Sequence, residues 1–250
     1  MDIRPIIAAA FVAALAATQA QASSVGFSSA DATFYQTCCG GPFPPSQMID
    51  GTTSGSNGWA VYSGSNNVSN AANALLTLTT PLAAGSYNLT FTIYQNFGTT
   101  SAESFHTLGD FSLGYTTDTS PTLSSLQTLV PNQSASSTDA STTFTQQVGG
   151  DWLVGGASPA IATYTLLASI SSTSAITGIF LDVFNNSTLP ADGPGRQPVN
   201  GNFVVSEFAL DATTTTPLPS TWLMLLSGFV GLGFFAYRGT KKNTAALAAA

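Results

Sequence analysis

The sequence predicts an all-β protein, an antiparallel β-sandwich of the jelly-roll type. Short apolar runs alternate with clusters of Gly, Ser, Asn, Thr and Pro, and no amphipathic helical stretch competes with them. The stretch 23–212 contains roughly eight such runs, which is enough for one sandwich with a core of its own. Terminal segments of a different kind precede and follow it.

The clearest strand is expected at residues 86–94. Tyr87, Leu89, Phe91 and Ile93 alternate with polar residues, so one face is apolar and the other polar. This pattern is typical of a half-buried antiparallel strand. Further strands are expected at 75–79, 111–116, 162–168, 176–184 and 203–210, whereas the polar stretch 131–143 is expected to be a surface loop.

The N-terminal segment, residues 1–22, is predicted to be a secretory signal peptide. Arg4 precedes an apolar run at 5–17, and Ala20-Gln21-Ala22 offers a small-x-small cleavage site. The mature chain would then begin at Ser23 and be exported.

The C-terminal segment is predicted to be a membrane anchor. A spacer rich in Thr and Pro at 213–221 precedes an uncharged apolar span at 222–237, and a basic tail follows at 238–250. Trp222 and Tyr237 flank the span as interfacial aromatic residues. The cations at Arg238 and beyond predict a cytoplasmic C-terminus.

This tail resembles the PEP-CTERM sorting tail of Gram-negative bacterial envelope proteins. The matching features are Pro217-Leu218-Pro219, the apolar span and the basic cluster that begins with Arg238, although Leu218 stands where the family has Glu. The resemblance implies cleavage by an exosortase-type transpeptidase. It also implies a cell-envelope location, with anchoring at the inner membrane before processing to the surface or the extracellular matrix.

The stretch 27–211 resembles galactose-binding-like (discoidin-type) jelly rolls. Three segments carry the resemblance: 48–61 with Asp50-Gly51 and Gly58-Trp59-Ala60, 105–117 with His106-Thr107-Leu108-Gly109, and 189–208 with Gly193-Pro194-Gly195-Arg196 and Asn200-Gly201-Asn202. Asp110 departs from the pattern, because an Arg is usual at that position.

In galactose-binding-like domains, a loop like 50–53 and a Glu near the last strand often hold a structural Ca²⁺. The resemblance therefore implies a calcium site at Asp50, Thr53 and Glu207, whose oxygen ligands suit that cation. The alternative is an exposed turn at Asp50, with Glu207 paired to Arg196 or placed at a strand end. A carboxylate among apolar neighbours needs such a partner.

Candidate ligand-binding residues are Trp59, Tyr62 and Arg196. The aromatic residues either form a sugar-stacking platform or belong to the core, and Arg196 either contacts a ligand or locks the loop before the last strand. His106 is the one histidine, and no G-x-S-x-G stretch precedes a helix. We therefore predict a structural histidine and no enzyme.

The charge balance excludes one class of function, and the two cysteines limit the possible disulfides. All but one of the twelve acidic residues lie within 23–216, whereas Arg196 is the one basic residue there. This balance excludes nucleic-acid binding through phosphates. Cys38 and Cys39 are adjacent and cannot join distant strands, so a vicinal disulfide or intermolecular pairing remains open.

Together these features predict an exported, membrane-tethered surface protein that an exosortase-like system processes. Its ectodomain is expected to be a non-catalytic module that binds exopolysaccharide or a surface glycan, with Ca²⁺ as a structural ion rather than a required cofactor. The alternative is a structural matrix or surface-layer component with no small ligand. A secreted esterase or glycosidase is the least favoured class.

Overall fold

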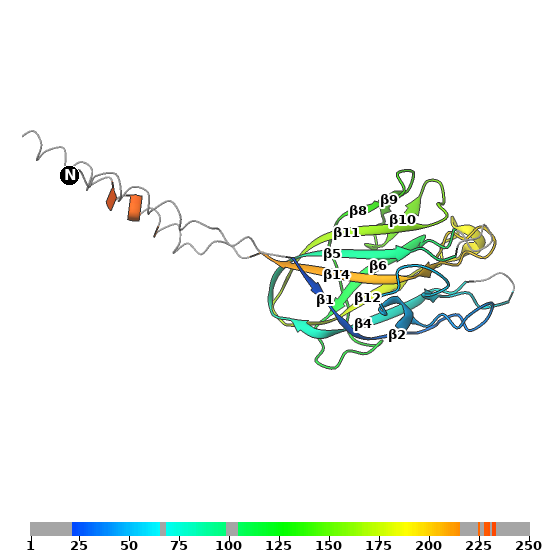
Figure 1. The fold of residues 1–250 in the computed structure, drawn as a ribbon, viewed down its shortest axis with the longest axis horizontal. Coiled ribbons are helices and arrows are strands. Elements are labelled where there is room, and N and C mark those ends of the chain that lie inside the picture. The colour runs from blue at the N-terminus through cyan, green and yellow to red at the C-terminus, as the bar shows by residue number, and fades with distance from the viewer. Residues whose placement is uncertain are drawn as a thin grey trace, which may run out of the picture. The chain divides into compact units, whose positions relative to one another are not determined.

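The computed structural model describes residues 22–65, 69–98 and 105–215, together with residues 225, 228–230 and 232–233. The chain divides into two units, Met1–Thr214 and Thr215–Ala250. The first unit confirms the predicted all-β class, because its elements are antiparallel strands with two short 3-10 segments, η1 (Pro45–Met48) and η2 (Pro190–Asp192) (Figure 1).

Two sheets form the layers of the sandwich. The first contains, in order, β1 (Ser23–Val25), β14 (Glu207–Thr214), β5 (Gly85–Gln95), β11 (Ala162–Ser172) and β8 (Asn132–Ser137). The second contains β2 (Phe27–Ala32), β4 (Ala72–Leu82), β12 (Ile176–Val183), β6 (Asp110–Thr116), β10 (Trp152–Gly155) and β9 (Thr143–Gln146), with β7 (Thr128–Leu129) beside β6. A separate pair joins β3 (Trp59–Ala60) to β13 (Val204–Val205).

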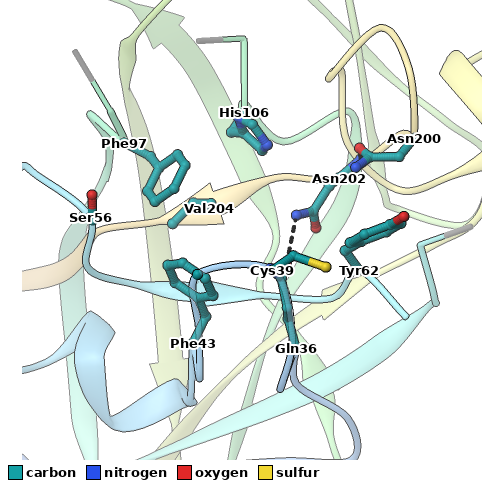
Figure 2. A pocket seen from close by; sticks show the side chains of 11 residues that line it. Gln36, Cys39, Phe43, Ser56, Tyr62, Phe97, His106, Asn200, Asn202 and Val204 are labelled. Atoms are coloured by element: carbon teal, nitrogen blue, oxygen red, sulfur yellow. Dashed lines mark hydrogen bonds between the residues drawn. The ribbon is translucent and has the colours of Figure 1, made fainter. Parts of the chain in front are cut away.

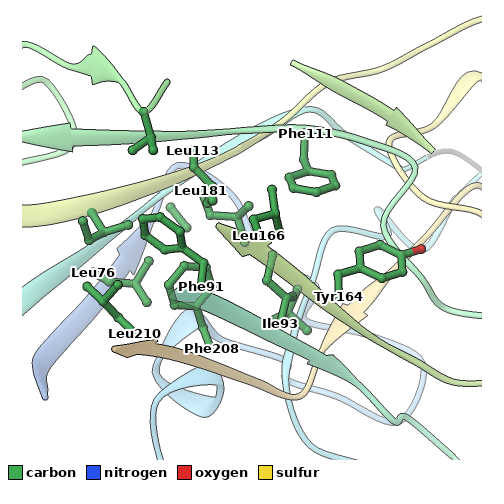
Figure 3. Close-up of a cluster of buried hydrophobic side chains, with 14 of the residues drawn as sticks. Leu76, Phe91, Ile93, Phe111, Leu113, Tyr164, Leu166, Leu181, Phe208 and Leu210 are labelled. Atoms are coloured by element: carbon green, nitrogen blue, oxygen red, sulfur yellow. The ribbon is translucent and has the colours of Figure 1, made fainter. Parts of the chain in front are cut away.

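The core lies between the two sheets and follows the predicted alternation. On β5 the side chains of Tyr87, Leu89, Phe91 and Ile93 are all buried, while the residues between them are partly or fully exposed. Figure 3 shows the cluster, in which Phe91, Ile93 and Phe208 of the first sheet lie with Leu76, Phe111 and Leu181 of the second. Full burial of one such side chain contributes about 1.5–3 kcal/mol, so this cluster holds the sheets together.

The prediction of a surface loop at 131–143 is wrong for its first half. Residues 132–137 form β8, which pairs with β11 so that Ala135 lies opposite Leu166. An edge strand needs backbone partners on one side only, and its other face can remain in water. Ser134 and Ser136 are exposed, so a polar sequence can occupy this position.

The strand predicted at 203–210 is also divided. β13 ends at Val205, and Ser206 separates it from the next strand. The backbone N–H of Ser206 donates to Tyr94 O of β5 at 2.8 Å. β14 then begins at Glu207 with Phe208 and Leu210 inward. Glu207 therefore lies half-exposed on the outer face of the first sheet, at the start of a strand, as one of the alternatives for this residue expects.

The terminal predictions lie largely outside the described residues. Residues 1–21 of the predicted signal peptide, the sorting residues Pro217, Leu218, Pro219 and Arg238, and most of the span 222–237 are not described. Residues 225, 228–230 and 232–233 are helical. Within the part of the chain that the structure describes, no helix has both the length and the apolar character that crossing a bilayer requires.

Strand register shows that the long connections gather at one end of the sandwich. β14 begins with Glu207 opposite Tyr94, next to the described connecting residues 33–58, 96–98, 105–109 and 184–203, and it ends with Thr214 opposite Tyr87. Ser23 pairs with Ala212. The strands that begin and end the sandwich therefore have Ser23 and Thr214 at the end away from these loops (Figure 1).

Candidate functional site

A pocket of about 230 Å³ opens among the loops at this end. Its residues come from segments far apart in the sequence, which the connections at this end of the sandwich bring together. The lining residues are Gln36, Cys39, Gly40, Phe43, Ser56, Tyr62, Phe97, His106, Asn200, Asn202 and Val204 (Figure 2).

Aromatic rings form one side of the pocket. Phe97 packs edge-to-face against Phe43, with ring centroids 5.4 Å apart, and against His106 at 5.1 Å. Tyr62 lies on the other side, beyond the amide groups (Figure 2). Val204 N donates to His106 O at 3.0 Å, which fixes the segment that carries the histidine. The pocket thus presents flat apolar surfaces with polar edges.

Two buried amide side chains form its floor. Asn202 Nδ2 donates to Gln36 Oε1 at 3.0 Å, and Asn202 Oδ1 accepts from Val61 N at 3.1 Å. Gln36 Nε2 in turn donates to Cys38 O at 3.0 Å. Because Asn202 and Gln36 are only 3% and 5% exposed, these bonds fix both amides before any ligand binds.

Close backbone contacts explain why glycines surround Asn202. A Cβ on Gly195 would lie 2.2 Å from Asn202 O, and a Cβ on Gly201 would lie 2.1 Å from Pro190 O. Gly201 also has φ +63°, a conformation that favours glycine. The Gly-Pro-Gly-Arg and Asn-Gly-Asn segments therefore hold the loop that places Asn202 in the pocket.

Of the three candidate ligand-binding residues, only Tyr62 lines the pocket. Trp59 is fully buried against Phe203, with centroids 5.1 Å apart, and donates Nε1 to Phe34 O at 3.1 Å. Of the two alternatives for Trp59, the structure therefore supports the core, because β3 turns its ring inward. Trp152 is also buried in the core, and the partly buried Tyr115 packs against the core.

Arg196 acts in the structure as a loop lock. It is 5% exposed, its Nη2 donates to Gly156 O at 2.7 Å, and its backbone N donates to Thr107 O at 2.8 Å. The guanidinium lies near the Tyr164 hydroxyl, whose pKa burial raises while the charge of Arg196 opposes the shift. Its burial excludes Arg196 as a surface ligand contact, and its side chain engages Gly156 rather than Glu207.

The residues proposed for calcium lie together at the neighbouring edge of the sandwich. Gly51 N donates to Glu207 Oε2 at 3.0 Å, which brings the 50–53 loop onto the start of β14. Asp50 Oδ1 accepts from Thr52 N at 2.9 Å and from Asn57 Nδ2 at 3.2 Å. Thr53 O accepts from Asn96 Nδ2 at 3.0 Å.

The chemistry of this corner suits a hard cation. Partial burial raises the pKa of Glu207, the backbone N–H of Gly51 opposes the shift, and the charge of Asp50 raises it further. The repulsion between two neighbouring carboxylates is reduced when both bind a cation such as Ca²⁺, which prefers oxygen ligands. Among the described residues, however, no group of three or more His, Cys, Asp or Glu side chains could hold a metal. Backbone carbonyls such as that of Thr53 would have to complete such a site.

Sequence reasoning did not identify most of the pocket. His106 and the 200–202 segment stand in the segments that resemble galactose-binding-like domains, which is the available signal for them. Gln36, Phe43 and Phe97 lie outside those segments, and only the fold brings them to the site. Cys39 also lines the pocket, and its thiol lies 2.7 Å from that of Cys38.

No protein-family model matches the sequence, and no curated protein matches it. Structural comparison aligns it with GH31 CBM32-2 bound to GalNAc at 12% identity and TM-score 0.40, over 75% of this chain and 98% of that one. A family 32 carbohydrate-binding module from Streptococcus pneumoniae EndoD aligns at 14% identity and TM-score 0.35, over 76% and 94%. The lectin binding domain of Lectinolysin complexed with Lewis b aligns at 9% identity and TM-score 0.31, over 75% and 92%.

Proposed function

We propose that the protein is a non-catalytic binding module for a neutral glycan, and that the pocket in Figure 2 holds one sugar unit. One observation carries the proposal: the described residues that line the pocket include amides, hydroxyls and aromatic rings but no Asp, Glu, Lys or Arg. Amide side chains both donate and accept hydrogen bonds, as sugar hydroxyls require, and ring faces cover apolar sugar edges.

The size of the pocket supports a small ligand. Its volume of about 230 Å³ lies below the range of roughly 300–1,000 Å³ that is usual for larger organic ligands. The floor is fixed by hydrogen bonds between Gln36, Asn202 and Val61, so little conformational entropy is lost when a ligand enters. A terminal or side-branch sugar of an exopolysaccharide fits these properties.

A glycan array probed with the full-length protein in mild detergent tests the proposal. We expect binding to neutral glycans, and we expect Tyr62→Ala to weaken it by about tenfold because an aromatic ring that lines the pocket is lost. Tyr35→Ala is the matched control, since Tyr35 is exposed and does not line the pocket. Silence across the array would contradict the proposal and favour a structural matrix or surface-layer component.

We further propose that Asp50, Thr53 and Glu207 hold a structural Ca²⁺. With the affinity usual for extracellular modules, about 10 mM Ca²⁺ should stabilise the chelator-treated protein by about 1–3 kcal/mol. Glu207→Gln should abolish this gain in thermal unfolding, whereas Asp211→Asn, on the same face of β14, should retain it. The raised pKa of Glu207 means that the gain should shrink as the pH falls, because a protonated carboxyl binds the ion poorly. Equal melting temperatures with and without Ca²⁺ would contradict the site.

The segment from Pro217 onward is proposed to be a PEP-CTERM-type sorting tail, which an exosortase-like enzyme processes at the cell envelope. The sequence pattern supports this proposal. Mass spectrometry of the mature C-terminus tests it. Loss of Lys241 and Lys242 is expected, whereas an intact basic end would contradict processing.

A further inference from the structure

The two cysteines occupy a tight turn at the rim of the pocket. Gly41 N donates to Cys38 O at 3.0 Å, and the central residues Cys39 and Gly40 have φ of 57° and 90°. Positive φ at both central positions is typical of a type I′ turn, which Gly and Asn usually form. The turn closes the bridge between Gln36 and Phe43, both of which line the pocket.

The turn places the two sulfur atoms together on the accessible side. The Cys39 thiol is exposed and lines the pocket, the Cys38 thiol is half-buried, and both are free. Their Sγ atoms are 2.7 Å apart. An exposed thiol beside a second thiol is the arrangement from which thiol–disulfide exchange proceeds.

We propose that Cys38 and Cys39 are an oxidative modification site that regulates the pocket, and that the oxidant is a low-molecular-weight disulfide. The Cys39 thiolate attacks one sulfur of that disulfide, forms a mixed disulfide and releases one thiol. Cys38 loses its proton, attacks Cys39 Sγ and releases the second thiol. Two protein thiols are thus oxidised to one disulfide while one small disulfide is reduced to two thiols. The regulatory part of the proposal rests on the pocket being the ligand site.

Covalent geometry makes this bond reversible. Adjacent Cα atoms are about 3.8 Å apart across a trans peptide, which is shorter than the roughly 4.4–6.8 Å of ordinary disulfides. A disulfide between neighbours is therefore strained, and strained or exposed disulfides are readily reduced. Such a bond suits a switch rather than a permanent crosslink.

Hydrogen bonds connect the turn to the pocket floor. Cys38 O accepts from both Gly41 N and Gln36 Nε2, and Gln36 Oε1 accepts from Asn202. A disulfide between neighbouring cysteines strains the peptide between them, which carries the Cys38 carbonyl, so we expect this carbonyl to shift when the ring closes. Gln36 then loses its acceptor, and Asn202 and its partner Val61 N are held less firmly. Oxidation should therefore weaken glycan binding.

The full-length protein is equilibrated with glutathione disulfide and then with excess dithiothreitol, and two properties are measured. Intact mass should fall by two hydrogens without a retained glutathione adduct, and this loss should reverse. The amide exchange of Val61, whose N–H donates to Asn202 Oδ1, should become about tenfold faster in the oxidised form. The amide of Leu89 in β5 is the internal control and should not change.

Cys39→Ser should remove both responses, because it leaves one thiol and no ring can close. A stable glutathione adduct or a disulfide-linked dimer as the main product would overturn the modification site. Ring closure with Val61 exchange unchanged within about twofold would overturn the coupling to the pocket. Neither readout uses a glycan, so failure of this proposal can be distinguished from failure of the glycan-binding function.

Discussion

Asp110→Asn is expected to stabilise the protein by about 1–3 kcal/mol at pH 8 and by almost nothing near pH 4. Asp110 lies at the start of β6 and is only 4% exposed. Its Oδ2 accepts from Asn186 Nδ2 at 2.7 Å, whereas its buried Oδ1 has no hydrogen-bond partner among the described residues. The carboxylate is therefore poorly compensated.

The sign of this stability change, and its dependence on pH, follow from the pKa of the Asp110 carboxyl. Burial raises the pKa of Asp110 from 3.8 to about 6; the bond from Asn186 opposes the shift, and nearby Asp151 adds to it. The folded state thus holds the proton more tightly than the unfolded chain. Stability from this group is present at low pH and is lost as the pH rises from about 4 to about 6. Above that range the penalty is complete.

Asparagine at position 110 removes the cost of burying a charge and keeps the hydrogen bond from Asn186. Its amide oxygen can still accept from Asn186, and its NH₂ group can donate toward Asp151. Thermal or urea unfolding at several pH values measures the effect, which corresponds to a melting temperature about 2–10 °C higher at pH 8.

Asp139→Asn provides a control of opposite sign. Hydrogen bonds from Ser141 and Thr142 lower the pKa of Asp139, so removing its charge should not stabilise the protein at pH 8. A gain for Asp110→Asn that is the same at pH 4 and pH 8 would contradict the explanation, as would destabilisation at pH 8.

Asn202→Ala is expected to destabilise the protein by about 2–4 kcal/mol and to abolish glycan binding. The side chain satisfies Val61 N and Gln36 Oε1, and both of these atoms belong to buried residues. Truncation leaves a buried donor and a buried acceptor without partners, and the cost of taking both groups out of water is then uncompensated. For a protein of this size, the melting temperature should fall by about 4–15 °C.

Asn88→Ala is the matched control for this substitution. Asn88 lies exposed on the outer face of β5, where its Oδ1 accepts from Ser169 at 2.7 Å. Its loss should change stability by no more than about 0.5 kcal/mol, as is usual for surface positions. If the two variants unfold alike, the hydrogen bonds of Asn202 do not support the pocket floor.

The sequence was sufficient to predict strands with strong alternation. β5 is predicted because its apolar residues recur with a period of two, and β12 because it is a short, largely apolar run, all of which is buried in the sandwich. β8 was not predicted because this edge strand consists mainly of Ser, Asn and Gln, so its sequence lacks the alternation of apolar and polar residues that indicates a strand. The strand expected at 203–210 is divided, and Glu207 begins β14, because the break at Ser206 depends on a bond to β5 that no local pattern reveals.

The site was harder to predict than the fold. A hydrogen bond from Gly51 brings the 50–53 loop to Glu207, whereas the calcium site at these residues stays a prediction. The pocket itself joins residues as distant as Gln36 and Asn202, whose pairing follows from loop packing rather than from any local pattern. Asp110 departs from the family pattern, but only the structure shows that its carboxyl is buried beside Asn186.

The most direct test of the glycan site is to map the contact by NMR. The full-length protein, labelled with nitrogen-15, is titrated with the neutral glycan that binds most strongly on the array. We expect shifts at the Val61 amide and at the side-chain amides of Gln36 and Asn202, with no change at Thr92 and Thr165 on the outer face of the first sheet. Shifts confined to that outer face, or none at saturation, would show that this pocket is not the glycan site.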